Sequence, residues 1–325
     1  MRERPQGVED AELASVLAER WALAVARLDY LPVGFGGYHW RATDRDGAQW
    51  FVTVTDLASM YGADLGPAME AAADLAAAGL DFVVAPVRTA AGPPVASLGY
   101  GYGVTLYPYV AGPPGEWGDV LGPGDRLAVV AMLAALHAAP PPALAPVREL
   151  RLARRDVLTE ALTALDRPWS GGPFAEPARK LLAGRTAEVT GALDRFDDLT
   201  RRVLSDGGPP VLTHGEPHAG NLLRDGAGFR LIDWDTIGLA SPERDLWDLV
   251  GADGARGPDP VTTAYERLTG RAVNQEAVAL YRLRWPLDEL CLIVAELRAP
   301  HGPGADTQTS FAALAESLDA LGQDG

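Results

Sequence analysis

The sequence has little cysteine and no long apolar run, and each shortage excludes a class of protein. Its one cysteine, Cys291, allows no intramolecular disulfide and no cysteine-built metal site, and the apolar run around it predicts a core position. No uncharged apolar stretch approaches the roughly 18–20 residues that a membrane span needs. The opening residues, MRERPQGVEDAEL, are too polar for a signal peptide. We therefore expect a cytoplasmic protein.

Positive charge is also scarce. The formal net charge is −16, and of the 28 lysines and arginines only Lys180 is a lysine, which leaves 27 arginines. Nucleic acids and anionic membranes would repel such a surface, so we expect neither as a partner. The charge permits a cationic small-molecule ligand, although an acidic surface often serves only solubility. Nothing in the sequence indicates the oligomeric state.

The composition is that of a globular protein large enough for two subdomains, with 325 residues of which 47% are hydrophobic and 22% charged. The first third predicts a small antiparallel sheet. Apolar residues recur at helical spacing over 13–21, and strand-like runs lie on both sides of the glycine-rich stretch VGFGGYHW. A proline and a glycine bound a second helix at 67–79. After the third strand, QWFVTVTDL, two more strands are expected at 81–87 and 102–110.

From about residue 110 the pattern becomes helical. A Pro-rich segment at 139–147 is expected to be a loop, and one strand-like stretch interrupts the helices, VLTHGEPHAGNLLRDGAGFRLIDWD at 211–235. In that stretch two short apolar runs flank a turn at Asp225-Gly226, which predicts a hairpin. The expected helices are 126–139, 154–165, 176–196, 260–270, 275–297 and 311–321.

The densest group of polar residues lies in the strand-like stretch. HGEPHAGN places a carboxylate two residues after a histidine and an asparagine five residues after the carboxylate; LIDWD and then PERDLWDL follow. A small sheet followed by a helical part with this hairpin resembles the aminoglycoside phosphotransferase family. That family is similar to choline and homoserine-type kinases and, more distantly, to protein kinases. The resemblance covers nearly the whole chain.

The resemblance implies an α+β fold of the bilobal protein-kinase-like type. A small antiparallel-sheet N-lobe would span 1–108, and a larger, mainly helical C-lobe would span 109–325. It also implies an enzyme, a phosphotransferase that uses ATP or GTP with Mg²⁺ and an alcohol group as acceptor. The acceptor would be a small molecule, with an aminoglycoside or another amine-bearing compound as the expected class.

Phosphoryl transfer needs cations over the phosphates and a carboxylate that orients the attacking hydroxyl. By resemblance, Glu216 would be the catalytic base, and Asn221 and Asp233 would hold Mg²⁺, which prefers hard oxygen ligands. Asp235 would contact the metal or a cationic substrate. His214 would be the scaffold of the catalytic loop, and a residue further along, Asp245, would brace that loop from behind.

Simpler explanations exist for single residues. Asn221 alone could be a turn residue, and Asp233 alone a cap at the end of a strand. His214 and His218 are spaced like a metal pair, but Pro217 between them excludes a regular helix and no third ligand is evident. The joint occurrence of these residues favours the kinase interpretation.

Two features depart from the family pattern. Glu216 stands where aspartate is usual, and a base displaced by about 1 Å can cost about a hundredfold in rate, unless the loop is shaped around the longer side chain. The third strand carries Phe51, Thr53 and Thr55 on one face, where the family has a lysine that pairs with the phosphates and with a helix glutamate. Glu70 stands at the place of that glutamate without its usual mate.

Other residues could complete a nucleotide site. Arg41 is a candidate replacement for the lysine, because the fork of a guanidinium suits phosphates. Gly34, Gly36 and Gly37 form a turn whose backbone amides could approach phosphates, with Thr53 as the facing strand residue. The backbone from Tyr107 to Tyr109 is expected to form the hinge that binds a nucleobase, which leaves ATP or GTP undecided.

Two other functions remain open. A pseudokinase would bind a nucleotide or a partner protein without efficient catalysis, and the missing lysine and Glu216 favour it. A related transferase using the same cleft is the third. Three carboxylates of the last long helix, Asp288, Glu289 and Glu296, could select an amine-bearing acceptor or could be a solvated helix face.

Overall fold

The computed structural model describes residues 1–59, 62–112, 115–226, 228–251 and 258–323. The chain divides into two compact units. The first combines Met1–Arg148 with Pro209–Val273, and the second combines Glu149–Gly208 with Asn274–Gly325. The expected lobe boundary after residue 108 stays a prediction.

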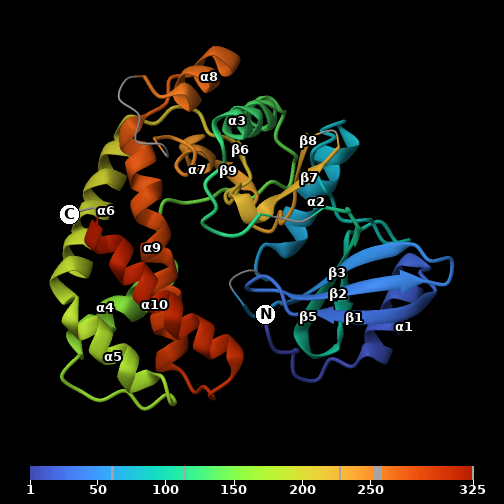
Figure 1. The fold of residues 1–325 in the computed structure, drawn as a ribbon, viewed down its shortest axis with the longest axis horizontal. Helices are drawn as coiled ribbons and strands as arrows, with labels where there is room; N and C mark the ends of the chain where they lie inside the picture. The colour runs from blue at the N-terminus through green and yellow to red at the C-terminus, as the bar shows by residue number, and fades with distance from the viewer. Residues whose placement is uncertain (60–61, 113–114, 227, 252–257, 324–325) are drawn as a thin grey trace. The chain divides into compact units, whose positions relative to one another are not determined.

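The first unit begins with a five-stranded antiparallel sheet in the order β1-β2-β3-β5-β4 (Figure 1). In β3, Val52 and Val54 are fully buried beneath the first helix, whereas Thr53 between them points to the other face. That second face is therefore free for polar groups. The strands are β1 (Val25–Leu31), β2 (Tyr38–Asp44), β3 (Gln49–Asp56), β4 (Val95–Leu98) and β5 (Tyr102–Pro108).

Two helices accompany this sheet, α1 (Asp10–Trp21) and α2 (Leu65–Ala77). Leu13 and Leu17 of α1 are fully buried in the apolar core between this helix and one face of the sheet. A short 3₁₀ turn, Gly99–Gly101, separates β4 from β5.

The expected strand at 81–87 is wrong. Val83 makes only an isolated bridge, to Leu231, and the fourth strand is instead β4, beyond the turn at Gly92. Pro86 explains the difference, because proline lacks the N–H that a strand in a sheet interior must donate. The segment after α2 pairs instead with the hairpin at 222–231, which we name the metal hairpin because the predicted metal ligand Asp233 follows it. The Leu231 N–H donates to Phe82 O at 2.7 Å, and the Val84 N–H donates to Leu231 O at 3.0 Å.

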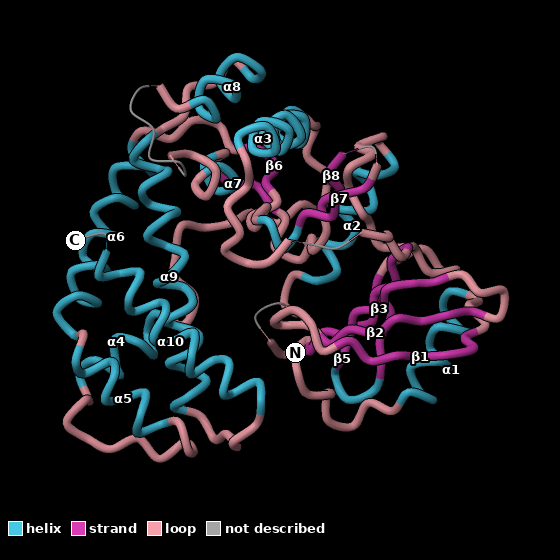
Figure 2. Tube along the Cα trace, viewed as in Figure 1, coloured by secondary structure: helices cyan, strands magenta, loops and turns pink. Residues whose placement is uncertain are grey.

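The rest of the first unit holds short strands and helices (Figure 2). The expected hairpin at 222–231 is present as β7 paired antiparallel with β8. Strand β6, which leads into the histidine motif, pairs antiparallel with β9. The bounds are α3 (Pro123–Ala138), β6 (Val211–Thr213), 3₁₀ turn Ala219–Asn221, β7 (Leu222–Asp225), β8 (Gly228–Leu231), β9 (Gly238–Ala240), α7 (Glu243–Leu246) and α8 (Pro260–Thr269).

The second unit is helical and has its own apolar core, which includes Cys291 as predicted. The single helix expected at 176–196 is wrong: α5 ends at Gly184 and α6 begins at Thr186. Glycine is a poor helix residue, and the Thr186 hydroxyl donates to Ala183 O at 3.1 Å across the break. The helices are α4 (Arg155–Thr163), α5 (Ala175–Gly184), α6 (Thr186–Ser205), α9 (Gln275–Arg298) and α10 (Ala305–Gln323).

Among the described residues, no helix combines the length and the apolar character needed to cross a membrane.

Candidate active site

The histidine motif is held by a buried carboxylate. Asp245, at the start of α7 and 1% exposed, accepts hydrogen bonds from the backbone N–H groups of His214 (2.8 Å) and Gly215 (2.6 Å). Burial alone would raise the pKa of Asp245, but the hydrogen bond from His137 and the nearby positive groups bring it below its usual value. The carboxylate is therefore ionised at neutral pH and fixes the backbone that leads into Glu216.

His214 is buried, and its hydrogen bonds define one tautomer. Its Nε2–H donates to Ile232 O at 2.9 Å, and its Nδ1 accepts the Glu216 N–H at 3.2 Å. Burial lowers the pKa of His214 to about 4, so the ring is neutral at pH 7. The ring also meets Trp234 edge to face, with centroids 4.6 Å apart. His214 thus joins the catalytic loop to the segment that carries Asp233.

Asn221 is oriented by the same loop. Its Nδ2 donates to Glu216 O at 2.9 Å and lies 3.3 Å from His218 Nε2. Because the nitrogen serves these two acceptors, the amide oxygen is the atom that Asn221 can present to a cation. The Ile232 N–H donates to Asn221 O at 3.0 Å, which keeps Asn221 beside the metal hairpin.

The two aspartates after β8 lie in an electrostatically unfavourable place. Asp233 has a φ of 65°, a conformation that costs a non-glycine residue about 1–3 kcal/mol and that clusters at functional sites. Burial raises the pKa of Asp233 to about 6, although solvent still reaches its side chain. Burial, followed by the charges of Asp233 and Glu216, raises the pKa of Asp235 well above its usual value. The carboxylates of Asp233 and Asp235 therefore repel each other, and a cation would relieve that repulsion.

Sequence reasoning missed the chain of side chains behind Asp245. His137 of α3 donates from Nε2 to Asp245 at 3.0 Å, and its Nδ1 lies 2.8 Å from the Tyr265 hydroxyl of α8. No local pattern in the sequence points to His137, because its partner is 108 residues away. Arg244 was also missed: it donates to Thr213 Oγ1 at 2.8 Å and to Thr236 O at 2.9 Å.

The glycine turn lies over the face of β3 where the lysine would be expected. Gly34 and Gly36 have φ values of 71° and 82°, which favour glycine. A Cβ on Gly37 would stand 3.2 Å from Thr53 and 3.0 Å from the His39 ring, so Thr53 and His39 lie directly beneath the turn. Burial lowers the pKa of His39 to about 3, and this histidine therefore supplies no positive charge at neutral pH.

Two predicted residues have partners elsewhere. Arg41 bonds Asp29 of β1 at 3.3 Å rather than reaching towards the glycine turn. Glu70 of α2 bonds Arg88 at 2.5 Å, so the glutamate has a mate, but on the segment between α2 and β4. Neither contact involves the catalytic loop.

The expected hinge residues differ in their surroundings. Tyr107 donates its hydroxyl to Met69 Sδ of α2 at 3.0 Å. Burial raises the pKa of Tyr107, and the charges of Asp233 and Asp235 raise it further, which places this side chain near the metal hairpin. Tyr109 is 40% exposed.

Within the described residues, no group of three or more histidine, cysteine, aspartate or glutamate side chains could hold a metal ion. The donors present do fit magnesium with a nucleotide, since Mg²⁺ is commonly bound through one or two carboxylates plus substrate phosphates and water. Asp233 and the amide oxygen of Asn221 are the residues that would hold it. The raised pKa values of Asp233 and Asp235 support that assignment, since a bound cation would stabilise their ionised forms.

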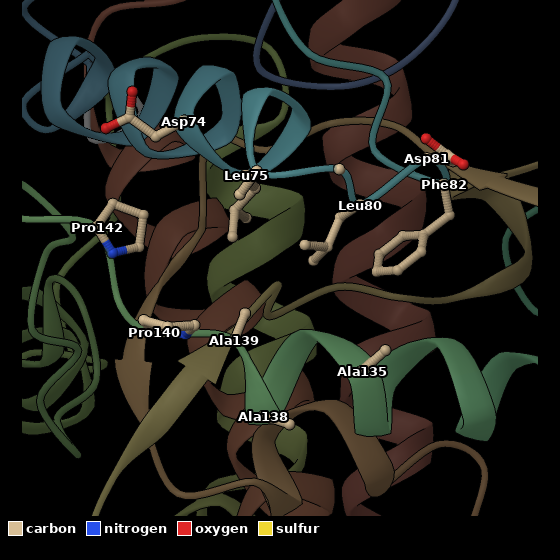
Figure 3. Close-up of a pocket in the computed structure, with 12 residues that line it drawn as sticks. Asp74, Leu75, Leu80, Asp81, Phe82, Ala135, Ala138, Ala139, Pro140 and Pro142 are labelled. Atoms are coloured by element: carbon tan, nitrogen blue, oxygen red, sulfur yellow. The ribbon is translucent and has the colours of Figure 1, made fainter.

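A hollow elsewhere in the first unit is not part of this site. It has a volume of about 560 Å³ and is lined mainly by apolar side chains of α2, α3 and residues 79–82 (Figure 3). Leu75, Leu80 and Phe82 face Ala135 and Ala139 across it. None of its lining residues belongs to the catalytic loop or to the metal hairpin.

The three carboxylates of α9 are engaged inside the second unit. Asp288 accepts from Ala153 N at 2.9 Å and from Arg284 at 2.8 Å. Glu289 accepts from Ser317, and Glu296 accepts from Ser310, both serines belonging to α10. All three side chains are therefore hydrogen-bonded within this unit.

Three solved structures illustrate what this fold is similar to. Spectinomycin phosphotransferase APH(9)-Ia in complex with ADP and spectinomycin matches with a TM-score of 0.75 at 16% identity, over 97% of this chain and 98% of that chain. The GDP and kanamycin complex of APH(2")-IIIa matches with a TM-score of 0.63 at 18% identity, over 97% and 100%. Choline kinase LicA from Streptococcus pneumoniae matches with a TM-score of 0.57 at 12% identity, over 96% and 99%.

These similarities confirm the α+β, bilobal protein-kinase-like fold, with a small antiparallel sheet followed by a mainly helical part. Among curated proteins no sequence match was found. The model of the phosphotransferase enzyme family matches residues 30–281, which include the glycine turn, the catalytic loop and the metal hairpin. The chain belongs to the phosphotransferase enzyme family.

Proposed function

We propose that the protein transfers the γ-phosphate of ATP or GTP, in the presence of Mg²⁺, to a hydroxyl group of a small molecule. The observation that supports this most strongly is the arrangement after β8, where Asp233 has a φ of 65° and Asn221 is oriented by its hydrogen bond to Glu216 O. A non-glycine residue in this conformation is typical of functional sites. The comparisons lend no support to the pseudokinase alternative.

Glu216 is the base in this proposal. As the acceptor oxygen bonds to the γ-phosphorus, the bond to the β,γ-bridging oxygen breaks and the acceptor proton passes to the Glu216 carboxylate. Asp245 holds the two backbone amides immediately before Glu216, so the longer side chain projects from a fixed loop. Such fixing answers the concern that glutamate would place the base too loosely.

Asp233 and Asn221 hold Mg²⁺, which when bound supplies positive charge over the transferred phosphoryl group. Asp235 contacts an amine of the acceptor, because a cation lowers the free energy of its strained ionised form. An amine-bearing small molecule, of the class that includes aminoglycosides, therefore remains the acceptor we propose.

The nucleotide lies between the glycine turn and the metal hairpin. Gly34, Gly36 and Gly37 present backbone amides to its phosphates, with Thr53 on the facing strand. Arg41 joins the phosphates by exchanging its present partner Asp29. The hinge backbone at Tyr107–Tyr109 binds the base.

Thermal shift with Mg²⁺ and either ATP or GTP tests the proposal. A ligand that binds only the folded state, at a hundredfold excess over its Kd, stabilises by about 2.7 kcal/mol and raises the melting temperature. Asp233→Asn is expected to abolish the Mg²⁺-dependent part of the shift, whereas Asp225→Asn in the same hairpin is the matched control and keeps it. No shift with either nucleotide would overturn the proposal.

Turnover is then measured with aminoglycosides, choline and amino alcohols as acceptors. Glu216→Gln is expected to lose at least about a hundredfold in kcat while nucleotide affinity is retained. If Glu216→Gln turned over as fast as the unmodified protein, Glu216 would not be the base. Nucleotide binding without turnover on any acceptor would favour the pseudokinase.

A further inference from the structure

In a kinase-like fold, a lysine on the third strand and a glutamate on the following helix connect that helix to the phosphate site. This chain lacks the connection. Thr53 occupies the strand beneath the glycine turn, and Glu70 is bonded to Arg88. Helix α2 therefore needs some other link to the catalytic groups if its position matters for the reaction.

Arg148 provides such a link, at the N-terminal end of α2. Its Nη1 donates to Asp64 Oδ2 at 2.8 Å, and Asp64 is the residue immediately before α2. Its Nη2 donates to Asp235 O at 3.1 Å and to Ile237 O at 2.9 Å, and its Nε donates to the same Ile237 O at 3.1 Å. One guanidinium thus connects the start of α2 to the segment that follows Asp233.

The arm of Arg148 starts from a fixed point. The Arg148 N–H donates to Leu239 O at 2.9 Å, and the Leu239 N–H donates to Pro146 O at 2.7 Å, so this segment adds to β9. Gly238 leaves room for it, since a Cβ there would stand 2.7 Å from the Arg148 side chain and 2.6 Å from Pro146 O. Only 20% of the Arg148 side chain is exposed. The guanidinium is held in place from both sides.

The chemistry requires arginine. A planar guanidinium has five donors in a fixed fork, whereas an ammonium group is a single point with three rotating donors. Two carbonyl oxygens and a carboxylate on different segments can be spanned only by the fork.

We propose that Arg148 is a positioning residue for phosphoryl transfer, which fixes the Asp235–Ile237 backbone and couples the start of α2 to it in place of the absent lysine–glutamate pair. The inference rests on the proposed phosphotransferase function. It assigns no contact with nucleotide or acceptor to Arg148. Its effect reaches the reaction through the position of Asp233 and Asp235.

Three variants and one control test the proposal by steady-state kinetics. Arg148→Gln removes the fork and is expected to lower kcat by about a hundredfold, the effect of a displacement of about 1 Å. Arg148→Lys keeps the charge but not the fork, and its kcat is expected to stay below about a tenth of that of the unmodified protein. Asp64→Asn cuts only the connection to α2; because Asp64 is half exposed, its expected loss in kcat is about three- to tenfold.

Arg88→Gln is the matched control. Arg88 also joins carboxylates of α2 through an exposed guanidinium, to Glu70 at 2.5 Å and Asp74 at 2.8 Å, but it touches no backbone of the metal hairpin. Its kcat is expected to stay within about twofold of the unmodified protein, as for most surface substitutions.

Adding Asp64→Asn to Arg148→Gln should lower kcat no further, because both substitutions act through one connection. Equal losses in Arg88→Gln and Asp64→Asn, or full activity in Arg148→Lys, would overturn the proposal.

Amide hydrogen exchange separates this inference from the proposed function. In Asp64→Asn, and not in Arg88→Gln, we expect faster exchange at residues 235–239 and at the first turn of α2. If this faster exchange occurred but the protein bound no nucleotide, the proposed function would be refuted and the coupling of α2 to the hairpin would stand. If the protein bound nucleotide and turned over, but Asp64→Asn changed neither the exchange nor kcat, the coupling would be refuted and the proposed function would stand.

Discussion

Replacing Asp245 by asparagine is the most stringent test of how the catalytic loop is held. The substitution keeps the shape of the side chain and exchanges one oxygen for an NH₂ group. Asp245 Oδ2 accepts two hydrogen bonds, from His214 N and His137 Nε2, and Oδ1 accepts one, from Gly215 N. Either orientation of the new amide turns its NH₂ group towards at least one buried donor.

The less costly orientation places NH₂ opposite the Gly215 N–H. That N–H then lacks an acceptor, at about 1–3 kcal/mol, and the two remaining bonds lose the assistance of the charge, at about 1 kcal/mol each. Together the expected loss is about 3–5 kcal/mol in the free energy of unfolding. Since about 2–4 °C corresponds to 1 kcal/mol in chains of about 150–250 residues, and somewhat less in longer ones, the melting temperature should fall by roughly 6–15 °C.

Differential scanning calorimetry of Asp245→Asn provides the measurement, with Asp198→Asn as the control. Asp198 pairs with Arg201 on the surface of α6 at 55% exposure, and its replacement should change stability by less than about 0.5 kcal/mol. If Asp245→Asn melted within about 2 °C of the unmodified protein, the loop would not depend on this carboxylate. The account of how Glu216 is positioned would then be refuted.

Three further predictions follow from the same geometry. Tyr265→Phe leaves His137 Nδ1 without its partner, and chemical denaturation should show a loss of about 1–2 kcal/mol; a loss under about 0.5 kcal/mol would contradict a stabilising role for this hydrogen bond. The pKa of Asp233 is raised to about 6, so its contribution to stability is fully present below the usual aspartate pKa and is lost as pH rises through 6. The metal-free protein should therefore become more stable when the pH is lowered from 7 to 5. Asp233→Asn should flatten this pH dependence of stability, and an unchanged pH dependence in that variant would contradict the prediction. Arg41→Ala should weaken nucleotide binding about tenfold by isothermal titration calorimetry if the guanidinium leaves Asp29 for the phosphates, and unchanged affinity would exclude that role.

The sequence predicted the parts of the site that lie in one short stretch. The order of His214, Glu216, Asn221 and Asp233 was readable because a turn, a hairpin and their spacing are local properties. The absence of a lysine from the third strand could be predicted for a different reason. Lys180 is the one lysine of the chain, so no residue of that strand can be a lysine, whichever face it points to.

Contacts between distant segments could not be predicted in this way. His137 and Asp245 meet across 108 residues, and Arg148 reaches Asp64 across 84. Neither histidine nor arginine carries a local signal of such a partner, because the partner is chosen by the packing of α3, α7 and the loops between them. The error at 81–87 has the same origin: the apolar run looks like a sheet strand, but residues 82–84 bond to β8 of the hairpin, and Val87 alone in the run donates to β5, at Leu106 O.

The hydrogen bonds between residues 82–84 and Leu231 have a mechanical consequence. They fasten the segment after α2 to β8, while Arg148 fastens the residue before α2 to the end of the same hairpin region. Helix α2 is thus anchored at both ends to the metal hairpin. A movement of the five-stranded sheet relative to the hairpin would leave these anchors intact and would strain the contacts of α2 with the sheet, such as that of Tyr107 with Met69. Cross-links between α2 and β8 should therefore leave turnover intact, whereas cross-links between α2 and β4 should stop it if turnover needs that movement.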